Sequence, residues 1–499
     1  MSLVIAPATM RMLEAESIAA GTPAQRLIES AGAAVTQAIM RRWPMLRRVL
    51  ICAGPGNNGA DACACARELA QLGISVTLIC WQRPNTDAWL CAASSAGAVY
   101  VEQWDKTLVE RLLPHVDLVV DGLLGIGLSR PPADTLLHLI EALNARLRRL
   151  PLVAIDVPSG CDAASGAVPS VAVRADVTLS TGPVKVGLCF LPAALQCGEI
   201  IELDIGIHLS PTDRRATRVL SSVYAQSLLP ARPVDSYKGT YGTVCVWAGS
   251  EAYPGAAYLA CIATARTGAG IVALAASPAV IPLAWPTPEV TLVPLVDDPH
   301  DALVQSHFST YLVGPGLGRS TQTAEYLQTF LGSADVAGRP VVLDADALTL
   351  LARIPDWPHT IAALPCVLTP HFGELRRLAG GTLIDLPPVE RAQYYARTWG
   401  HVIIMKGSVT VIASPDGRTA LWAHPNPALA VAGSGDVLAG IVAGFIAQHC
   451  DLYSAACLAV AVHGLAGQHI AQTAGTAGVL ASELAAAIPG AVQALRAQS

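Results

Sequence analysis

Short runs of aliphatic and β-branched residues alternate with longer helical patterns along all 499 residues of the chain. This alternation is typical of βα units that build a parallel sheet with helices on its faces. We expect strands at residues 49–53, 75–80, 118–121, 152–156 and 177–180, and, in a second series, at 243–247, 270–274, 311–313, 341–343, 367–368, 402–405 and 410–413. The sequence therefore predicts an α/β fold, in which ligands bind beyond the carboxyl ends of the strands.

The alternation breaks between the two series. Residues 209–222 are polar and charged, without an apolar pattern, and include the stretch Ser210-Pro-Thr-Asp-Arg-Arg215. Such a composition is typical of a linker. We therefore expect two domains, residues 1–212 and 223–499.

Composition excludes several classes of partner. Charged residues make up only 14% of the chain and the formal net charge is -6, so no basic surface is expected for nucleic acid or anionic lipid. The uncharged run 267–288 is long enough to span a membrane, but its four prolines favour a buried strand that leads into a loop. We expect a small-molecule partner, no nucleic acid, no membrane and a homo-oligomer.

The cysteines and the N-terminus indicate the compartment. Thirteen cysteines, an odd number without framework spacing, predict reduced thiols. Cys63 and Cys65 have no second Cys/His pair nearby, so they are interpreted as small buried residues. The first residues lack the basic and apolar regions of a secretory signal. The sequence therefore predicts a cytoplasmic protein.

Three strand-end loops of the first series carry oxygen-rich side chains. They are Gly54-Pro-Gly-Asn-Asn-Gly-Ala-Asp61, the glycine-rich segment from Asp121 to Arg130, and Asp156-Val-Pro-Ser-Gly160. In this architecture the three loops converge, and Asn58, Asp121, Asp156 and Ser159 can supply ligands for a hard cation. The alternative interpretation is Asx-turn and capping chemistry at each separate loop.

The most informative stretch of the second series is Gly433-Ser434-Gly435-Asp436, which opens an apolar helix. Backbone amides at a helix start attract an anion, and an aspartate there can take a proton from a hydroxyl that attacks phosphorus. The alternative is a tight turn whose aspartate caps the helix. The other strand-end loops of the series are 249–257, 314–318, 344–348, 369–374 and 406–410. Alone, His371 would more often be structural, but within this series it is interpreted as a substrate contact.

Residues 1 to 210 resemble the NAD(P)H-hydrate epimerase domain. The resemblance rests on Leu27-Ile-Glu-Ser-Ala-Gly32 and the three loops above, in this order. It implies a Rossmann-like three-layer αβα domain, potassium ligands Asn58, Asp121 and Ser159, and the acid/base Asp156, with Asp61 as the second candidate. The implied substrate contacts are Asn57, Asn58, Gly59, Ala60, Asp61, Gly125, Ile126, Gly127, Leu128, Ser129, Arg130, Pro131 and Asp156.

Two departures bear on this half. The family's Gly-Gly-Asp-Gly is Gly59-Ala60-Asp61-Ala62 here, and its Gly-Thr-Gly is Gly125-Ile126-Gly127. A methyl group at Ala60 is tolerable with a negative φ and strained with a positive one. The prediction of epimerase activity therefore depends on the backbone at Ala60.

Residues 224 to 495 resemble the ribokinase-like, ADP-dependent NAD(P)H-hydrate dehydratases, through the ordered loops of the second series. The resemblance implies a ribokinase-like αβα domain with ADP as co-substrate and magnesium on its phosphates. The implied substrate contacts are Ala257, Gly316, His371 and Asp436, and the implied nucleotide contacts are Lys406, Gly407, Ser408, Val409, Thr410 and Gly435. The family's Asn-Pro-Gly-Met-Ala-Thr-Gly-Gly is Asn-Pro-Ala-Leu-Ala-Val-Ala-Gly at 426–433, a change expected to weaken nucleotide affinity without abolishing activity.

Together the two resemblances predict a bifunctional enzyme of nicotinamide nucleotide repair. It would interconvert R- and S-NADHX or NADPHX, then dehydrate the S epimer to NAD(P)H while ADP becomes AMP and phosphate. Asp436 is the expected base of the second reaction. The alternative is a ribokinase-like kinase of a small molecule, with a first domain that only binds a ligand.

Overall fold

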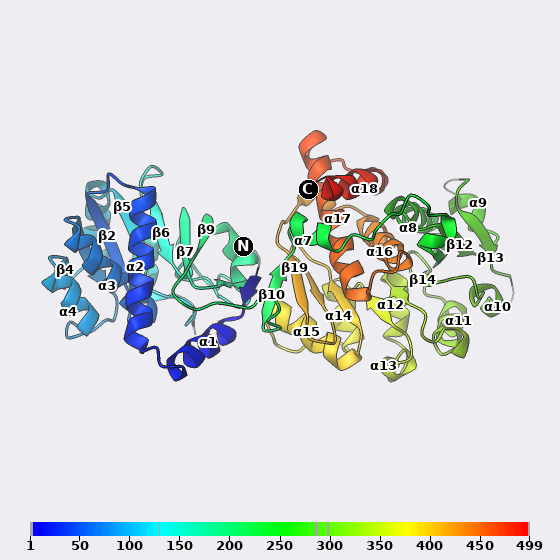
Figure 1. Cartoon of the computed structure of the whole chain (residues 1–499), viewed down its shortest axis with the longest axis horizontal. Coiled ribbons are helices and arrows are strands. Elements are labelled where there is room, and N and C mark those ends of the chain that lie inside the picture. Colours follow the sequence, from blue (N-terminus) through cyan, green and yellow to red (C-terminus); the bar gives the residue numbers. More distant parts are fainter. Residues whose placement is uncertain (1–2, 129, 285–287, 297–298, 498–499) are drawn as a thin grey trace. The chain divides into compact units, whose positions relative to one another are not determined.

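The structure, a computed structural model, describes residues 3–128, 130–284, 288–296 and 299–497. The chain divides into two compact units, Met1–Thr217 and Arg218–Ser499. Figure 1 shows the first unit in blue to green and the second in green to red. Each unit is described separately.

The first unit is built on a parallel sheet (Figure 1). Its strand order is β4 (Val99–Val101), β3 (Ser75–Cys80), β2 (Arg48–Ala53), β5 (Leu118–Gly122), β6 (Leu152–Ile155), β7 (Val177–Thr181) and β9 (Glu199–Leu203). The neighbouring strands all pair in parallel, so their carboxyl ends share one edge. A two-residue strand, β8 (Val184–Lys185), pairs with β1 (Leu3–Ile5) outside this sheet.

Helices cover both faces of this sheet because alternate residues of each strand point to opposite sides. Val49 and Ile51 share a core with α2 (Ala24–Arg42) and α3 (Asn57–Gln71). Leu50 and Cys52 share a core with α5 (Lys106–Leu112) and α6 (Asp134–Asn144). The unit is completed by α1 (Pro7–Ala19) and α4 (Ala88–Ser95). The three-layer αβα arrangement predicted for the first domain is therefore confirmed.

Helices α2 and α3 approach each other closely at Gly32. A Cβ atom at this position would lie 2.5 Å from Cβ of Ala64. Contacts this short do not occur between real side chains, so the packing of α2 on α3 depends on the absence of a side chain there.

The sheet of the second unit runs in the order β13 (Thr291–Pro294), β12 (Ile271–Ala276), β11 (Thr243–Trp247), β14 (Thr310–Val313), β15 (Val341–Leu343), β16 (Cys366–Leu368), β17 (Val402–Met405), β18 (Thr410–Ala413) and β19 (Thr419–Trp422). Pairing is parallel from β13 to β17 and antiparallel from β17 to β19. The loops after the parallel strands therefore meet at one edge.

Helices α8 (Pro254–Thr267), α16 (Ser434–Ala447), α17 (Leu452–Thr473) and α18 (Ala481–Arg496) share one core with Val244 and Leu312 of the sheet. Phe330 of α11 (Thr321–Leu331) packs on Tyr311 with ring centroids 5.2 Å apart, and Tyr311 is adjacent to Leu312 in β14. The remaining helices of the unit are α7 (Ser222–Ser227), α9 (Ile281–Ala284), α10 (His300–Leu303), α12 (Ala345–Leu351), α13 (Trp357–Thr360), α14 (Phe372–Leu378) and α15 (Pro388–Trp399). The second domain thus has the expected layered α/β fold.

Helix α17 is long and apolar enough to cross a membrane by length and composition alone. However, 72% of its most apolar window is buried inside the protein. The helix therefore has the burial of a core helix in this fold.

The linker prediction was wrong in part. Residues 209–222 contain a strand, β10 (Ala216–Val219), and the division between the two units falls inside it, after Thr217. Four residues among arginines are too few for a detectable alternation. Helix α3 begins at Asn57, so the first predicted substrate loop ends in a helical turn.

Candidate active sites

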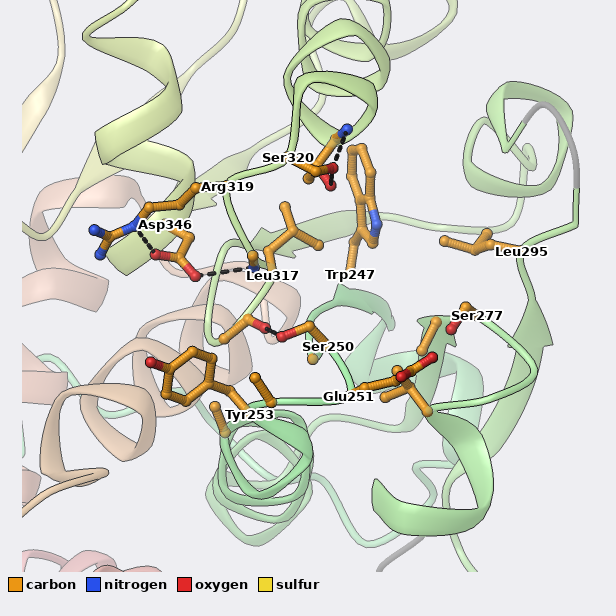
Figure 2. Close-up of a pocket in the computed structure, with 18 of the residues that line it drawn as sticks. Trp247, Ser250, Glu251, Tyr253, Ser277, Leu295, Leu317, Arg319, Ser320 and Asp346 are labelled. Carbon is orange, nitrogen blue, oxygen red and sulfur yellow. Dashed lines mark hydrogen bonds and ion pairs between the residues drawn. The ribbon is translucent and has the colours of Figure 1, made fainter.

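The second unit holds a cavity of about 1170 Å³ at the carboxyl edge of its sheet (Figure 2). It is lined by residues that follow β11, β12, β14 and β15, together with Asp436 from α16. The Asp346 carboxylate accepts hydrogen bonds from the Gly318 amide at 2.9 Å and from Nε of Arg319 at 2.6 Å. Figure 2 shows Asp346 and Arg319 side by side in this wall. Ser250 Oγ donates to the Gly316 carbonyl at 2.8 Å. These bonds tie the loops of three strands into one wall.

Asp436 lies in the first turn of α16. Gly433 precedes the helix with φ +89, a left-handed conformation that favours glycine, and a Cβ atom there would lie 2.4 Å from Cδ1 of Leu259. Burial, then the nearby Asp344, raises the pKa of Asp436 to about 7, and Lys406 opposes this shift. A carboxylate with a pKa near neutrality is suited to general-base catalysis.

Lys406 is held beside the start of this helix by two carboxylates. Its Nζ atom donates to Oδ1 of Asp344 at 2.7 Å and lies 3.8 Å from Oε2 of Glu374. Burial acts to lower the pKa of Lys406, but Asp344 and Glu374 outweigh it and the pKa is raised. A Cβ atom on Gly435 would lie 3.4 Å from the same Nζ. The structure therefore brings Lys406, Gly435 and Asp436 together.

Asp344 is the centre of this ion-pair network. It is 1% exposed, and its Oδ1 atom also accepts a hydrogen bond of 2.7 Å from Thr369 Oγ1. The next residue, Ala345, has φ +50, a conformation that is costly for a residue other than glycine. The surrounding contacts hold this strained turn, which lies between Asp344 at Lys406 and Asp346 in the cavity wall.

His371 has a structural contact that the sequence did not reveal. Its Nδ1 atom caps α14 by accepting a hydrogen bond from the Gly373 amide at 2.9 Å, and the His371 amide donates to Oε2 of Glu374 at 2.9 Å. The side chain remains 54% exposed, and a bridge pairs His371 with Lys406. His371 thus lies next to the Lys406 cluster, although it does not line the cavity.

Only some of the other predicted substrate and nucleotide contacts line the cavity. Gly316 and Asp436 line the cavity, whereas Ala257 is fully buried and its neighbour Ala256 lines the cavity instead. Gly407 and Ser408 form an exposed bend after β17, Val409 is buried, and Thr410 begins β18. Thr410 Oγ1 donates to the Gly407 carbonyl at 3.3 Å.

The segment 426–433 departs from the family pattern, and its backbone is not strained: its positive φ angle is at Gly433, where glycine tolerates it. None of the residues 428–432 has a positive φ, so the alanines in place of glycine are accommodated. Asn426 accepts the Ala428 amide at 3.0 Å and stabilises the 3₁₀ turn Pro427–Leu429. The change therefore removes a hydroxyl group at Val431 without distorting the start of α16.

A buried histidine supports that helix start. Nε2 of His463 lies 3.1 Å from Ser434 Oγ and 3.0 Å from the Ser434 carbonyl. Burial lowers the pKa of His463 to about 4, so the ring is neutral at physiological pH. The sequence analysis missed His463 because it lies in the middle of the apolar helix α17.

In the first unit, Asp156 follows β6 with φ +66 and is buried. Its Oδ1 atom contacts Nζ of Lys185 and accepts a bond of 3.1 Å from Thr181 Oγ1. Burial, together with Asp156 and Glu14, raises the pKa of Asp61 well above its usual value. The two candidate acid/base groups, Asp156 and Asp61, therefore lie in one cluster.

The predicted potassium ligands converge. Ser159 Oγ donates to Oδ1 of Asp121 at 2.6 Å, and the Leu124 amide donates to Ser159 Oγ at 2.8 Å. Asn58 Nδ2 donates to the Leu124 carbonyl at 2.8 Å, while its Oδ1 atom is buried without a hydrogen-bond partner in the described part of the chain. An unpartnered buried oxygen among oxygen donors fits a hard cation such as potassium.

The buried position of Asp121 among these groups shifts its pKa. Burial raises the pKa of Asp121 to about 6, although hydrogen bonds from Ser159 and the Leu123 amide oppose the shift. A bound cation would favour the ionised carboxylate, so the residues present fit the ion.

Arg83 holds the first predicted substrate loop in place, a contact that the sequence analysis missed. Its Nε and Nη2 atoms donate to the carbonyls of Gly54 and Gly56 at 2.8 and 2.7 Å, and Nη1 pairs with Asp87 at 2.7 Å. Asn57, Asn58, Gly59, Ala60 and Asp61 form the first turn of α3 directly after this loop. The φ of Ala60 is not positive, so its methyl group causes no backbone strain.

The second predicted substrate loop, residues 125–131, is more exposed to solvent than the first. Gly127, Arg130 and Pro131 are exposed, Ile126 and Leu128 are half-buried, and Ser129 lies outside the described residues. Arg11 of α1 donates to the Ile126 carbonyl at 3.0 Å. Gly125 lies beside Asp156, because a Cβ atom on it would be 3.2 Å from Oδ2.

Fold and site define a two-domain α/β enzyme whose second domain belongs to the ribokinase-like class. A solved ribokinase-like superfamily protein from Enterococcus faecalis V583 is 27% identical, with a TM-score of 0.50 over 58% of this chain and 99% of that chain. A family model described as NAD(P)H-hydrate dehydratase matches residues 244–490, and one described as YjeF-related protein N-terminus matches residues 24–187.

Relatives of full length define the family. The bifunctional NAD(P)H-hydrate repair enzyme Nnr of Coxiella burnetii is 35% identical over 496 residues, which cover 95% of this chain and 96% of that protein. The Escherichia coli enzyme of the same name is 32% identical over 480 residues, which cover 93% of this chain and 88% of that protein. The chain belongs to the family of bifunctional NAD(P)H-hydrate repair enzymes.

Proposed function

We propose that this chain restores hydrated NAD(P)H in two reactions. The first unit interconverts the R and S epimers of NADHX and NADPHX, and the second dehydrates the S epimer while ADP becomes AMP and phosphate. The observation that supports the second reaction best is Asp436, whose pKa is raised to about 7 at a helix start that opens into the large cavity. Family membership disfavours the alternative of a simple kinase.

In the dehydratase, Asp436 removes the proton of the C6 hydroxyl group as its oxygen attacks the terminal phosphorus of ADP. The bond to the α-phosphate breaks and AMP leaves. In the described part of the chain the amides of Gly435 and Asp436 donate no hydrogen bond, and Lys406 lies beside Gly435. These groups would stabilise negative charge on the transferring phosphoryl group.

The phosphorylated intermediate then loses its leaving group. The lone pair of ring nitrogen N1 expels phosphate from C6, and loss of a C5 proton restores the double bond of NAD(P)H. The hydroxyl group alone would leave as hydroxide, which is a poor leaving group. The phosphoryl group that is added to the C6 oxygen therefore leaves as phosphate during the dehydration.

Magnesium fits this site as an ion carried by the nucleotide. Among the described residues no three His, Cys, Asp or Glu side chains are placed to hold a metal ion. Magnesium commonly binds through substrate phosphates and one or two carboxylates, and Asp346 and Asp436 are carboxylates of the cavity wall that could hold it. When bound, the ion would neutralise phosphate charge.

In the epimerase, Asp156 gives a proton to the C6 hydroxyl group and later takes one from water. The carbon carries both oxygen and ring nitrogen, so the protonated hydroxyl leaves as water and water returns on either face. Asn58, Asp121 and Ser159 would hold potassium, which would order the three loops around the substrate. Potassium should raise the melting temperature of the wild type, and Asn58→Ala should abolish this rise; an unchanged rise would contradict the assignment.

The test of the whole proposal uses purified S-NADHX and ADP. Dehydratase activity restores the near-ultraviolet absorbance of NADH and releases AMP and free phosphate in equal amounts. A stable phosphorylated product would instead identify a kinase. R-NADHX should be converted faster than its spontaneous epimerisation allows; a rate equal to the background would leave the first unit a binding domain.

The thirteen cysteines are all free, which supports a reducing compartment, and we therefore place the enzyme in the cytoplasm. We also propose that it forms a homo-oligomer and acts on small molecules without nucleic acid or membrane. Light scattering of the purified chain tests the oligomeric state, and a monomeric mass would contradict it.

A further inference from the structure

Lys185 is a buried cation beside the candidate acid/base of the first unit. Its side chain is only 1% exposed, and its Nζ atom contacts Oδ1 of Asp156. The same Nζ donates to the Thr181 carbonyl at 2.8 Å and to Ser180 Oγ at 3.4 Å. A buried ammonium group needs such a full set of partners. The Lys185 ammonium group therefore contacts Asp156 and two oxygens of neighbouring residues, Thr181 and Ser180, and is shielded from solvent.

The carboxylate of Asp156 has one tied oxygen and one free oxygen. Oδ1 receives both Lys185 and the Thr181 hydroxyl. Among the described residues no hydrogen bond is found for Oδ2, and this atom faces Gly125, where a Cβ atom would lie 3.2 Å away. The absence of a side chain at Gly125 leaves the space beside Oδ2 open.

The backbone fixes the same orientation. Asp156 has φ +66, and its amide donates to the Leu179 carbonyl at 2.7 Å. A left-handed aspartate persists only where its surroundings hold it in place. Together, backbone and side-chain bonds leave the carboxylate little freedom to rotate.

We propose that Lys185 is the positioning residue of the epimerase unit. By holding Oδ1 it presents Oδ2 of Asp156 to the C6 hydroxyl group of the hydrated nicotinamide ring, without touching the substrate. The inference rests on the proposed epimerase function and deepens it. Lys185 was absent from the sequence-based site because it ends a two-residue strand, β8.

The surrounding charges make the cation necessary. Glu14 from α1 and Asp61 from α3 lie close enough to interact with Asp156, and burial raises the pKa of each. Glu202 from β9 interacts with Lys185, while Arg11 and Arg83 act on Glu14 and Asp61. Removal of the Lys185 side-chain charge would leave Oδ1 of Asp156 without the contact that orients it, beside two other carboxyl groups.

The experiment compares Lys185→Met and Thr181→Val in the full-length chain. The assay contains R-NADHX, ADP and an excess of the Asp156→Asn chain, which supplies dehydratase so that NADH formation reports epimerisation alone. Dehydratase turnover of each variant on S-NADHX measures the concentration of chain whose second unit is folded, and thermal denaturation reports the folding of the first unit. Lys106→Met, a half-exposed lysine of the same unit, is the matched control.

Lys185→Met should lower kcat of epimerisation about 10²-fold with KM changed less than about twofold, because the substrate contacts remain. Thr181→Val leaves the ion pair intact but removes one hydrogen bond to Oδ1 of Asp156, so it should lower kcat about 10-fold. Lys106→Met should match the wild type.

The results separate the inference from the function on which it rests. Wild-type kcat in both variants, or a rise of KM at constant kcat in Lys185→Met, would overturn the positioning role. If Lys185→Met does not fold, Thr181→Val decides: unchanged kcat overturns the inference and a lowered kcat supports it. A wild-type chain without epimerisation above background, or an active Asp156→Asn chain, would instead refute the proposed epimerase chemistry.

Discussion

Replacement of Asp436 with asparagine should make the second unit more stable and nearly inactive. Burial, helped by Asp344, raises the pKa of Asp436 from its usual 3.8 to about 7, against the effect of Lys406. A carboxyl group with a raised folded-state pKa lowers the free energy of unfolding when it is ionised, because the unfolded chain holds the same charge in water. Asparagine keeps the shape without the charge and removes this cost.

The size of the gain follows from the pKa shift. A shift of about three pH units corresponds to at most about 4 kcal/mol. Asp436 is only partly buried, so solvent screening reduces the expected gain to about 1–3 kcal/mol. Below pH 3.8 Asp436 is protonated in both the folded and the unfolded wild type and does not reduce its stability. The free energy of unfolding falls as the pH rises from 3.8 to about 7, and Asp436 causes no further decrease above pH 7. The gain is therefore small near pH 4 and complete near pH 8.

Urea denaturation of the full chain at both pH values measures the stability of the second unit. Asp416→Asn is the matched control: hydrogen bonds from Arg418 outweigh burial and lower the pKa of Asp416, so this variant should be less stable near pH 8. ADP-dependent turnover of Asp436→Asn should fall about 10²- to 10⁴-fold. A variant that is less stable than the wild type near pH 8, as the loss of a helix cap would produce, or that keeps near-normal turnover, would refute the reasoning.

Lys406→Met leaves Asp344 as an unpaired buried charge and should lower the free energy of unfolding by about 3–5 kcal/mol in urea, whereas the exposed Lys238→Met should change nothing; equal stability of both would contradict the network. His463→Phe removes the partner of Ser434 Oγ and should cost about 1–3 kcal/mol. Burial lowers the pKa of His463 from 6.5 to about 4, so the wild type loses stability as the pH falls from 6.5 to 4, where the unfolded chain binds a proton that the folded chain does not. His463→Phe should lack this part of the acid destabilisation. The same pH dependence of stability in wild type and variant would contradict this prediction. Gly32→Ala should cost about 1–3 kcal/mol by forcing α2 from α3, and an unchanged melting temperature would show that the helices adjust freely.

The sequence predicts the sheets well because their central strands are buried on both faces and read as continuous apolar runs. The strands at 75–80, 243–247, 341–343, 402–405 and 410–413 match the structure to the residue. Edge and short strands such as β8 and β10 were missed, since two to four residues carry no detectable periodicity. The expected domain boundaries at 212 and 223 remain predictions.

The candidate site was only partly predictable. Glycine and aspartate at strand ends indicate a crevice, and Asn58, Asp121 and Ser159 do lie together. The sequence does not show which charges pair across the fold. Lys185 and Asp156 meet only through tertiary packing.

Asp344 and Glu374 stood in predicted loops without a role, because their partner Lys406 is distant in sequence. His371 was interpreted as a substrate contact, and its capping bond to the Gly373 amide became visible only in three dimensions. Which nitrogen of a histidine is occupied by the backbone is not encoded in a local motif. The same limit applies to Arg83, whose bonds to the loop carbonyls join residues 27 and 29 positions apart.

The negative φ angles at Ala60, Ala428 and Ala432, where the family pattern has glycine, have a consequence for recognising distant members of this family. A search pattern that demands glycine at these positions would discard this chain, although its backbone there is ordinary for an alanine. Gly433, with φ +89 and no room for a side chain, is a position where the demand is physically justified. Sequences that vary at 60 or 428 should be retained as candidate repair enzymes, and those that vary at 433 should be set apart.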